Sequence, residues 1–383
     1  MRHAVIVSAV RTGVGKYGGQ YVNVSEDKLC AVTMKEAVAR ARIDPSEIED
    51  AFVGNLRGRY GNVGRVSYLV AGLPVTTPVA TVDRQCGASL QAIECAATKI
   101  ISGFADVILA SGTENMTLSP YQMAKVPNYQ WEAPKFLESR LDPDEHVMIE
   151  TAENVAKKYG ASRQECDQWA VISHLRASGA IQAGLFDREK AAVLSRVKGK
   201  DVEITQDECV RSDTHFDKLS KMSAVMKPDG VVTAGNACPR GDGAASALLM
   251  SDQRAKDLGL TPMAKIRASA VVGLDPLYMG YGPVPAIQKA LKQSGLTIAD
   301  IDCFEINEAF AAQFVPCVRD LGIDPEKVNP NGGAIAMGHP LGATGAILTT
   351  KLLYAMERGN LRLGVVAMCV GGGQGMAVVY ERD

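Results

Sequence analysis

The sequence lacks the residue patterns of several protein classes. Its nine cysteines are an odd number without a CxxC pair, and its five histidines include no HExxH motif. These spacings argue against a disulfide framework and against a zinc site. An excess of either charge is also missing, because 41 Lys and Arg residues face 43 Asp and Glu residues and leave a net charge of −2. We therefore expect no metal, nucleic acid or membrane partner.

Long apolar runs are missing as well. The longest apolar stretch, residues 365–379, is interrupted by four glycines and one glutamine, so it is not expected to span a bilayer. The first residues, Met1-Arg2-His3 before a short strand-like run, do not have the pattern of a signal peptide. Because cysteines without a disulfide pattern are typical of a reducing compartment, we predict a cytoplasmic protein.

Glycine, by contrast, is abundant. The chain contains 37 glycines in 383 residues, about a tenth of the chain where ~7% is usual. They gather late in the sequence, at Gly332-Gly333, at Gly342 and Gly345, and at Gly371-Gly372-Gly373. Glycine is preferred where the backbone turns sharply or approaches a ligand, so these clusters indicate candidate binding loops.

Strand and helix patterns alternate at both ends of the chain. The last 130 residues repeat the alternation of the first 115, and segments 83–112 and 331–371 share the order strand, loop, long helix, apolar strand. We therefore predict an α/β fold with mostly parallel, doubly covered sheets and an internal duplication. The predicted strands are 4–9, 50–54, 105–110, 301–306, 364–370 and 376–380, and the predicted helices are 25–42, 86–102, 285–294, 308–321 and 340–358.

The alternation lapses between residues 117 and 239. Prolines interrupt the first part of this segment, and Ser162-Arg163-Gln164-Glu165 is a capping box that predicts the start of a helix. An insertion this long is uncommon unless it has a function, and covering an active site is a usual one. The predicted domains are an N-terminal core half, 1–116, an inserted loop domain, 117–239, with 240–258 returning to the N-terminal half, and a C-terminal core half, 259–383.

Cys86 is the first candidate catalytic residue. It lies in Asp83-Arg84-Gln85-Cys86-Gly87, at a predicted junction of strand, loop and helix. Backbone N–H groups at a helix N-terminus stabilise a thiolate and lower the pKa of a cysteine. The negative charge of Asp83 opposes this effect. The alternative interpretation is a buried cysteine with a purely structural role.

His339, Cys369 and Asn307 are further candidates, because each is expected at a loop end of the α/β frame. His339 precedes Pro340, which is predicted to be the first residue of a helix. Cys369 ends a buried strand just before a glycine turn, where Gly371 could offer its N–H to an oxyanion. The alternatives are a capping histidine, a core cysteine and a helix N-cap asparagine.

Together these residues resemble the motifs of the thiolases. Cys86-Gly87, Asn307-Glu308-Ala309-Phe310-Ala311, the run 331–345 with Gly338-His339-Pro340, and Cys369-Val370-Gly371-Gly372-Gly373 follow the family's order over essentially the whole chain. The resemblance implies a five-layered αβαβα core of two duplicated halves, with the inserted loop domain covering coenzyme A. It also implies an acyltransferase that makes or cleaves the carbon–carbon bond of 3-ketoacyl-CoA, an activity of fatty acid metabolism.

The resemblance further implies a role for each matching residue. Cys86 is expected to hold the acyl group as a thioester, His339 to deprotonate Cys86, and Cys369 to exchange the α-proton of acetyl-CoA. Asn307, through a water molecule, is expected to join His339 in one oxyanion hole, while the N–H groups of Cys86 and Gly371 form the other. One cysteine cannot hold the acyl group and take the proton at once, so two cysteines around one histidine have a mechanistic reason. The expected substrate and coenzyme A contacts are Met148, Ala237, Cys238, Ala309 and Phe310.

Two departures from the family pattern lie beside these residues. Asp83 stands where the family usually has Asn, and Cys238-Pro239 replaces a usual Ser-Gly, which removes a hydroxyl that often meets the pantetheine. We predict an acetyl-CoA C-acetyltransferase that uses coenzyme A thioesters as substrates and no cofactor, and the family implies a homodimer or homotetramer. The alternatives are a longer-chain 3-ketoacyl-CoA thiolase and a catalytically silent CoA-binding subunit. Cys369 argues against a third, a decarboxylating condensing enzyme on the same fold.

Overall fold

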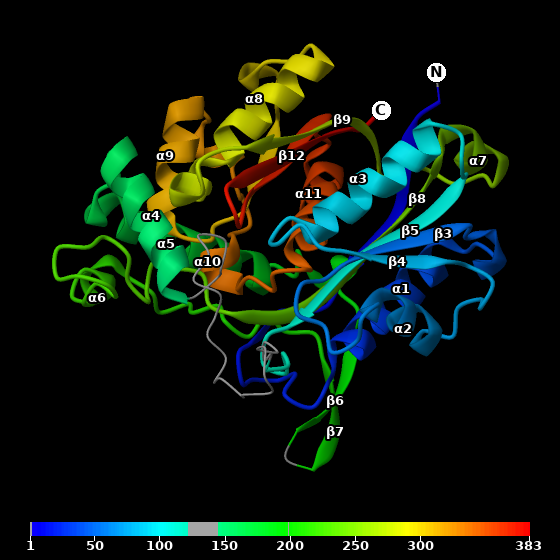
Figure 1. Ribbon diagram of the computed structural model, residues 1–383, viewed down its shortest axis with the longest axis horizontal. Helices are drawn as coiled ribbons and strands as arrows, with labels where there is room; N and C mark the ends of the chain where they lie inside the picture. The colour runs from blue at the N-terminus through cyan, green and yellow to red at the C-terminus, as the bar shows by residue number, and fades with distance from the viewer. Residues whose placement is uncertain (1, 122–144, 198) are drawn as a thin grey trace, which may run out of the picture.

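Ten strands form one mixed sheet in the computed structural model, which describes residues 2–121, 145–197 and 199–383 (Figure 1). The short β2 (Gly15–Lys16) pairs with β8 beside the main path. The order across the sheet is β10 (Cys303–Ile306), β11 (Leu363–Val370), β12 (Gln374–Glu381), β9 (Ala264–Gly273), β1 (Ala4–Arg11), β8 (Gly241–Ser251), β5 (Val107–Asn115), β3 (Asp50–Gly54) and β4 (Val79–Val82).

The two halves of this sheet repeat one another. From the edge inward, the N-terminal half runs β4, β3, β5, β8, β1. The C-terminal half runs β10, β11, β12, β9, and its outer position is taken by Val328, which bridges Phe304 in parallel. In both halves the outer two pairings are parallel and the inner two antiparallel. The halves meet where β1 pairs with β9, and the predicted duplication is confirmed.

Helices lie between the half-sheets and on both outer faces. Six helices of the described chain form these layers: α1 (Glu26–Ala41), α2 (Val63–Val70), α3 (Ala88–Ile101), α8 (Pro283–Ser294), α9 (Ala311–Leu321) and α11 (Thr344–Gly359). The matching helices α3 and α11 pack against each other in the centre, while α1 with α2 and α8 with α9 cover the outer faces (Figure 1). The predicted five-layered αβαβα class is confirmed. Shorter elements are α7 (Asp252–Asp257), α10 (Ala334–Met337), η1 (Pro45–Glu47), η3 (Asp187–Glu189), η4 (Pro276–Tyr281), η5 (Ile298–Asp300) and η6 (Pro325–Lys327).

The prediction of mostly parallel sheets is wrong. β11 and β12 are joined by a short glycine turn, and strands joined by so tight a turn must run antiparallel. β8, which follows the insertion, also runs antiparallel to both of its neighbours in the sheet. The alternation of strands and helices identified the crossover units, but it contained no information on the direction in which β8 and β12 run.

Three helices begin later than predicted. The sequence places their starts at residues 86, 308 and 340, whereas α3, α9 and α11 begin at Ala88, Ala311 and Thr344. The residues left out of α3 include Cys86, and Asn307 and His339 directly precede the predicted starts of α9 and α11. All three candidate side chains therefore belong to irregular backbone just ahead of a helix.

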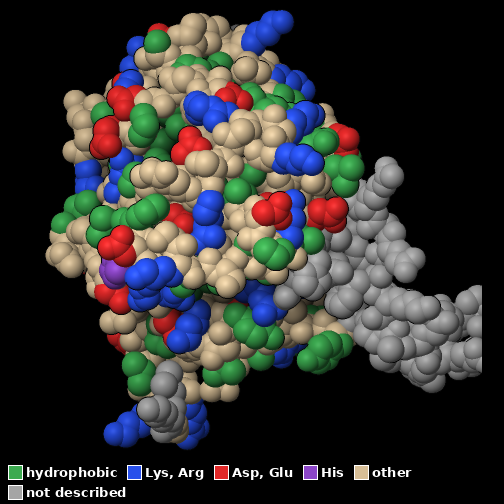
Figure 2. All heavy atoms as spheres, turned by 90° about the vertical axis from the view of Figure 1, so that its left-hand side faces the viewer, with side chains coloured by type: hydrophobic (Ala, Val, Ile, Leu, Met, Phe, Trp, Pro, Cys, Tyr) green, Lys and Arg blue, Asp and Glu red, His purple; other side chains and the backbone are tan. Residues whose placement is uncertain are grey.

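The insertion packs against the C-terminal half. Its helices α4 (Glu145–Tyr159) and α5 (Arg163–Gln182) contact α9, and α6 (Phe216–Leu219) and the hairpin β6 (Val193–Val197) and β7 (Lys200–Ile204) follow. The predicted capping box is confirmed, since Ser162 and Glu165 each accept a hydrogen bond from the other's backbone N–H. On this side Lys and Arg side chains are spread over the surface with Asp and Glu between them (Figure 2). Residues 122–144 of the predicted proline-rich loop lie outside the described chain, and the predicted domain boundaries stay predictions.

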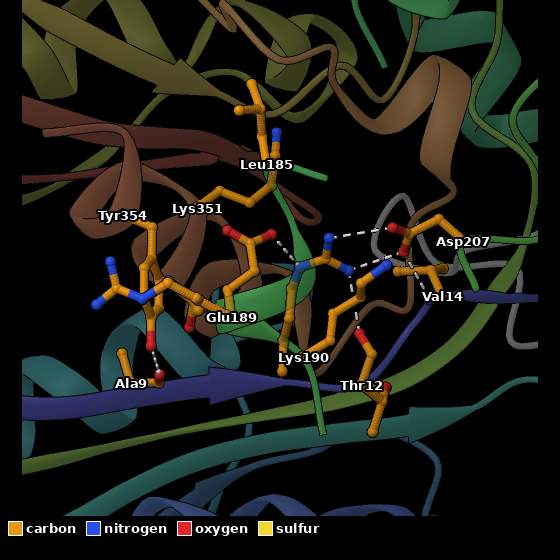
Figure 3. Close-up of polar contacts among 12 residues, drawn as sticks. Ala9, Thr12, Val14, Leu185, Glu189, Lys190, Asp207, Lys351 and Tyr354 are labelled. Carbon is orange, nitrogen blue, oxygen red and sulfur yellow. Dashed lines mark hydrogen bonds and ion pairs between the residues drawn. The ribbon is translucent and has the colours of Figure 1, made fainter. Parts of the chain in front are cut away.

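A buried ion cluster ties the insertion to the first strand. Arg11, the last residue of β1, donates from Nε to Glu189 and from Nη1 to Asp207, each at 2.7 Å, and all three side chains are inaccessible to solvent. Glu189 and Asp207 face each other across the guanidinium (Figure 3). Burial opposes ionisation of Asp207, but the charge of Arg11 outweighs it and lowers the pKa of that carboxyl.

Removing this guanidinium deprives two buried carboxylates of the counter-charge to which both are hydrogen-bonded. We expect Arg11→Met to lower the free energy of unfolding by about 3–5 kcal/mol, measured by denaturant titration. The matched control is Arg2→Met, because the ion pair of Arg2 with Asp106 is partly exposed and should contribute at most about 1 kcal/mol. Equal losses in the two variants would contradict the structural role given to the cluster.

Candidate active site

Asn307 and His339 meet in the interior of the molecule. Asn307 Nδ2 lies 3.3 Å from His339 Nε2, and both residues are buried. Asn307 directly follows β10, and its N–H continues the ladder by donating to the Ala367 carbonyl at 2.9 Å. The N-cap alternative for Asn307 is wrong, because α9 begins only at Ala311 and the asparagine side chain turns to the histidine instead.

The hydrogen bonds of His339 fix which ring nitrogen carries the proton. Its Nδ1 lies 2.6 Å from Thr344 Oγ1, and the Thr344 hydroxyl donates its hydrogen to the Pro340 carbonyl at 2.9 Å. Thr344 Oγ1 must therefore accept from Nδ1–H, which leaves Nε2 as the basic nitrogen. Burial lowers the pKa of His339 to about 4, so the imidazole is neutral at pH 7 and able to take a proton.

Thr344 is expected to set this tautomer. Thr344→Val keeps the shape of the side chain but removes the acceptor for Nδ1–H. A smaller fraction of the His339 rings then has an unprotonated Nε2. We therefore expect kcat to fall on the order of 10²-fold, the lower end of what acid–base catalysis contributes. Thr344→Ser retains the hydroxyl and should keep most of the activity. Steady-state assays of the thiolysis that the resemblance implies provide the measurement, and equal activity of the valine and serine variants would refute the role.

Cys86 lies in the tight turn ahead of α3. Gln85, just before it, has a positive φ of 46°, and the Gln85 N–H donates to Asp83 Oδ1 at 2.7 Å, so Asp83 holds this turn. The Gly371 N–H donates to the Cys86 sulfur. The expectation of a lowered thiol pKa is wrong, because burial raises the pKa of Cys86 to about 11 and outweighs that hydrogen bond. The resting residue is a neutral thiol, and its activation requires a base.

This raised pKa gives a pH dependence that can be measured. Below the pKa only the small ionised fraction of Cys86 reacts with iodoacetamide, and that fraction grows tenfold per pH unit. Alkylation of Cys86 in the free protein should therefore accelerate steadily from pH 7 to pH 10 and level off near 11. A plateau already reached at pH 8 would contradict a thiol whose pKa burial raises.

Cys369 lies at the end of β11 within a small apolar cluster. Met279 and Ala309 are buried against it, and Met148, Cys238 and Phe310 pack around them. Burial, and next the nearby charge of an ionised Cys86, raise the pKa of Cys369 well above 9. An ionised Cys86 therefore lies close enough to influence the ionisation of Cys369, and four of the five predicted contact residues, all but Ala237, pack around Cys369.

The segment around residues 236–240 joins the parts of this site. Ala237 bridges Phe310, and the Cys238 N–H donates to the Ala309 carbonyl at 3.0 Å. The His339 N–H donates to the Pro239 carbonyl at 3.1 Å. The structure thus brings together all of the candidate residues from six separated segments of the chain: Cys86, Met148, Ala237, Cys238, Asn307, Ala309, Phe310, His339, Cys369 and Gly371.

The sequence motifs did not reveal the polar residues that support the site. Thr344 is one, and Glu114 is another: its buried carboxylate accepts from the N–H groups of Leu56, Arg57 and Gly342, and burial raises its pKa to about 7. The available signal for Glu114 was a glutamate shortly after the apolar run 107–110, in a strand whose residues are all buried. No group of three or more His, Cys, Asp or Glu side chains in the described ranges could hold a metal ion. Nor does any helix of those ranges have the length and hydrophobicity to cross a membrane.

Comparison with known proteins gives consistent matches over the whole chain. The family model for the thiolase N-terminal domain matches residues 4–253, and that for the thiolase C-terminal domain matches residues 260–382. A 3-ketoacyl-CoA thiolase of Bacillus subtilis is 45% identical and an acetyl-CoA acetyltransferase of Escherichia coli 42% identical, each match covering 100% of both chains. The crystal structure of the Bacillus anthracis acetyl-CoA acetyltransferase superposes with a TM-score of 0.95 at 39% identity, covering 100% of this chain and 99% of that one.

Proposed function

Because the chain belongs to the thiolase family and is an acyltransferase, we propose that it catalyses the reversible condensation of two acetyl-CoA molecules to acetoacetyl-CoA and coenzyme A. The observation that carries this proposal is the convergence of Cys86, Cys369 and the Asn307–His339 pair in one buried site. The site offers a nucleophile, two candidate bases and two sets of hydrogen-bond donors, which are the groups that a Claisen condensation needs.

The first half-reaction transfers the acetyl group to Cys86. As the sulfur attacks the thioester carbonyl, His339 Nε2 takes its proton, and the N–H groups of Cys86 and Gly371 donate to the tetrahedral oxygen. The carbon–sulfur bond to coenzyme A then breaks, and the departing thiolate takes the proton of Cys369. This last transfer gives Cys369 the charge it needs, because its raised pKa prevents it from ionising unaided at neutral pH.

The second half-reaction forms the carbon–carbon bond. The Cys369 thiolate removes the α-proton of a second acetyl-CoA, and the enolate oxygen accepts from the now protonated His339 Nε2 and from a water molecule held by Asn307. The enolate carbon attacks the acetyl group on Cys86, the bond to Cys86 breaks, and acetoacetyl-CoA leaves. His339 returns its proton to the Cys86 thiolate, so every group regains its starting state and the kinetics are ping-pong.

The surroundings of Cys369 support a small acyl group. Met148, Met279 and Phe310 pack close to this sulfur, and such an environment fits a two-carbon group better than a long acyl chain. A longer-chain specificity is the second candidate, since methionine side chains adapt to ligands of different shape and one relative at 45% identity is named 3-ketoacyl-CoA thiolase.

A thiolysis assay across 3-ketoacyl-CoA chain lengths tests the proposal. We expect the highest kcat/KM with acetoacetyl-CoA and a decline as the acyl chain lengthens. A maximum of kcat/KM at a medium chain length, on the order of six or more carbons, would contradict the proposal and favour the longer-chain alternative. Absence of thiolysis with every chain length, together with retained CoA binding, would favour the catalytically silent subunit.

We also propose that the enzyme is a homodimer or homotetramer that works in the cytoplasm with no cofactor beyond its coenzyme A substrates. Unpaired edge strand β4 supports self-association, because the neighbouring α2 and the loop after it expose Leu69, Val70 and Val75. Light scattering measures the oligomeric state, and a monomer at micromolar concentration would refute that part of the proposal.

A further inference from the structure

The proposed mechanism leaves one buried carboxylate beside Asn307 without a role. Glu308 is the next residue in the chain, and its side chain is completely inaccessible to solvent. Its two oxygens accept four hydrogen bonds, Oε1 from Trp169 Nε1 at 3.0 Å and Asn329 Nδ2 at 2.8 Å, and Oε2 from Ser173 Oγ at 2.7 Å and the Ile335 N–H at 3.2 Å.

All four partners of Glu308 act as donors. An indole N–H, an amide NH2 and a backbone N–H have only hydrogens to offer. The Ser173 hydroxyl accepts from the Gly333 N–H at 3.1 Å, which leaves its own hydrogen for Glu308. Four donors around two oxygens match an ionised carboxylate, because that group is purely an acceptor. A glutamine could not satisfy the same partners, since its NH2 would face two donors.

The partners come from three segments that converge on the catalytic pair. Asn329 also holds both backbone groups of Ile306, accepting from its N–H at 2.8 Å and donating to its carbonyl at 2.9 Å. This contact fixes the end of β10 immediately before Asn307. Ile335 lies in α10, which leads directly into Gly338 and His339. Glu308 therefore joins the segment that carries the asparagine to the segment that carries the histidine.

The backbone around Glu308 is shaped to fit the carboxylate closely. A Cβ added at Gly333 would lie 2.2 Å from Glu308 Cδ and 2.4 Å from each carboxylate oxygen. This separation is far below van der Waals contact, so the loop that leads to His339 can approach Glu308 only because residue 333 is glycine. The contact is independent of the four hydrogen bonds and restricts the same loop.

We propose that Glu308 is a positioning residue that sets the separation of Asn307 and His339, and that it serves the enolate step through Asn307. The inference rests on the proposed function, which places Asn307 at the enolate oxygen. His339 has its own anchors, because Thr344 holds its ring and the Pro239 carbonyl accepts from its N–H. Disturbing Glu308 should therefore displace Asn307 more than the histidine, and impair condensation more than acylation of Cys86.

Glu308→Gln tests this inference, because the side chain keeps its size but presents hydrogens to two donors. We expect the kcat of condensation to fall on the order of 10²-fold, which is typical of a lost oxyanion donor. Single-turnover acetylation of Cys86, followed by mass spectrometry, should slow by about threefold or less, well under the factor of 10 that corresponds to ~1.4 kcal/mol. Ser173→Ala removes one donor and keeps the carboxylate, so it should lower the ratio of condensation to acetylation by a smaller factor. This variant provides the measurement if Glu308→Gln does not fold.

Glu189→Gln is the matched control for loss of a buried carboxylate. Glu189 is equally inaccessible but binds Arg11, outside the site, so this variant should lower the melting temperature without changing the ratio of condensation to acetylation. Equal changes in that ratio for the Glu308 and Glu189 variants would overturn the inference. A wild-type enzyme that forms no acetyl-Cys86 would instead overturn the proposed function, so the two failures are distinguishable.

Discussion

Cys86→Ala is expected to reduce thiolysis and condensation by at least about 10⁴-fold, because removal of a nucleophile abolishes the covalent route and leaves only binding and oxyanion stabilisation. Because Cys86 is a neutral thiol in the resting enzyme, Cys86→Ala removes no buried charge and should disturb the fold little. Coenzyme A should still bind, as measured by calorimetry, and the melting temperature should change little. The loss should therefore appear almost entirely in kcat.

The matched control for Cys86→Ala is Cys95→Ala. Cys95 lies on α3, the helix that follows Cys86, and its sulfur accepts from Gln91 Nε2 at 3.3 Å. Replacing it removes a thiol from the same helix without touching the site, so activity should stay within about twofold of the wild type, as is usual for substitutions away from such features. A Cys86→Ala enzyme that retains more than about a hundredth of the wild-type rate would exclude Cys86 as the nucleophile.

Cys369→Ala is expected to separate the two half-reactions. Without this base the α-proton of the second acetyl-CoA is not removed, so condensation should fall by about 10²–10⁴-fold, the usual contribution of a general base. Acetylation of Cys86 should continue at a reduced rate, because water can supply the proton to the departing coenzyme A thiolate. Rapid-quench mass spectrometry follows the acetyl-enzyme, and a coupled assay follows acetoacetyl-CoA.

Cys30→Ala is the control for Cys369→Ala, since Cys30 is also a fully buried thiol but lies in α1 within the other half. Its loss creates a small cavity and should lower stability while leaving the ratio of the half-reactions unchanged. An equal reduction of acetylation and condensation in Cys369→Ala would contradict the division of labour between the two cysteines.

The sequence was sufficient for the frame of the molecule. β3 spans the predicted residues 50–54, α1 differs from its prediction by one residue at each end, and the internal repeat is visible in the strand order. Such elements carry their own periodicity and stop signals, so they can be predicted locally. The antiparallel direction of β8 could not be predicted in this way, because it depends on where the insertion returns to the sheet.

The candidate catalytic residues could be selected from their motifs, but their chemical states could not. The raised pKa of Cys86 comes from burial by distant segments, and this burial outweighs the local effect of the helix start that the sequence suggested. The tautomer of His339 depends on Thr344, whose role becomes visible only when α11 is seen to begin there. Likewise, Glu308 meets Trp169 from a helix about 140 residues earlier, a contact that no local pattern encodes.

The most direct measurement is the location of the acetyl group after brief incubation of the wild-type enzyme with acetyl-CoA and rapid acid quench. Peptide mapping by mass spectrometry should place one acetyl group on Cys86 and none on Cys369, and a second incubation with coenzyme A should remove it. An acetyl group found on Cys369, or no adduct on an enzyme that still cleaves acetoacetyl-CoA, would contradict a site in which two sulfur atoms perform different tasks around one imidazole.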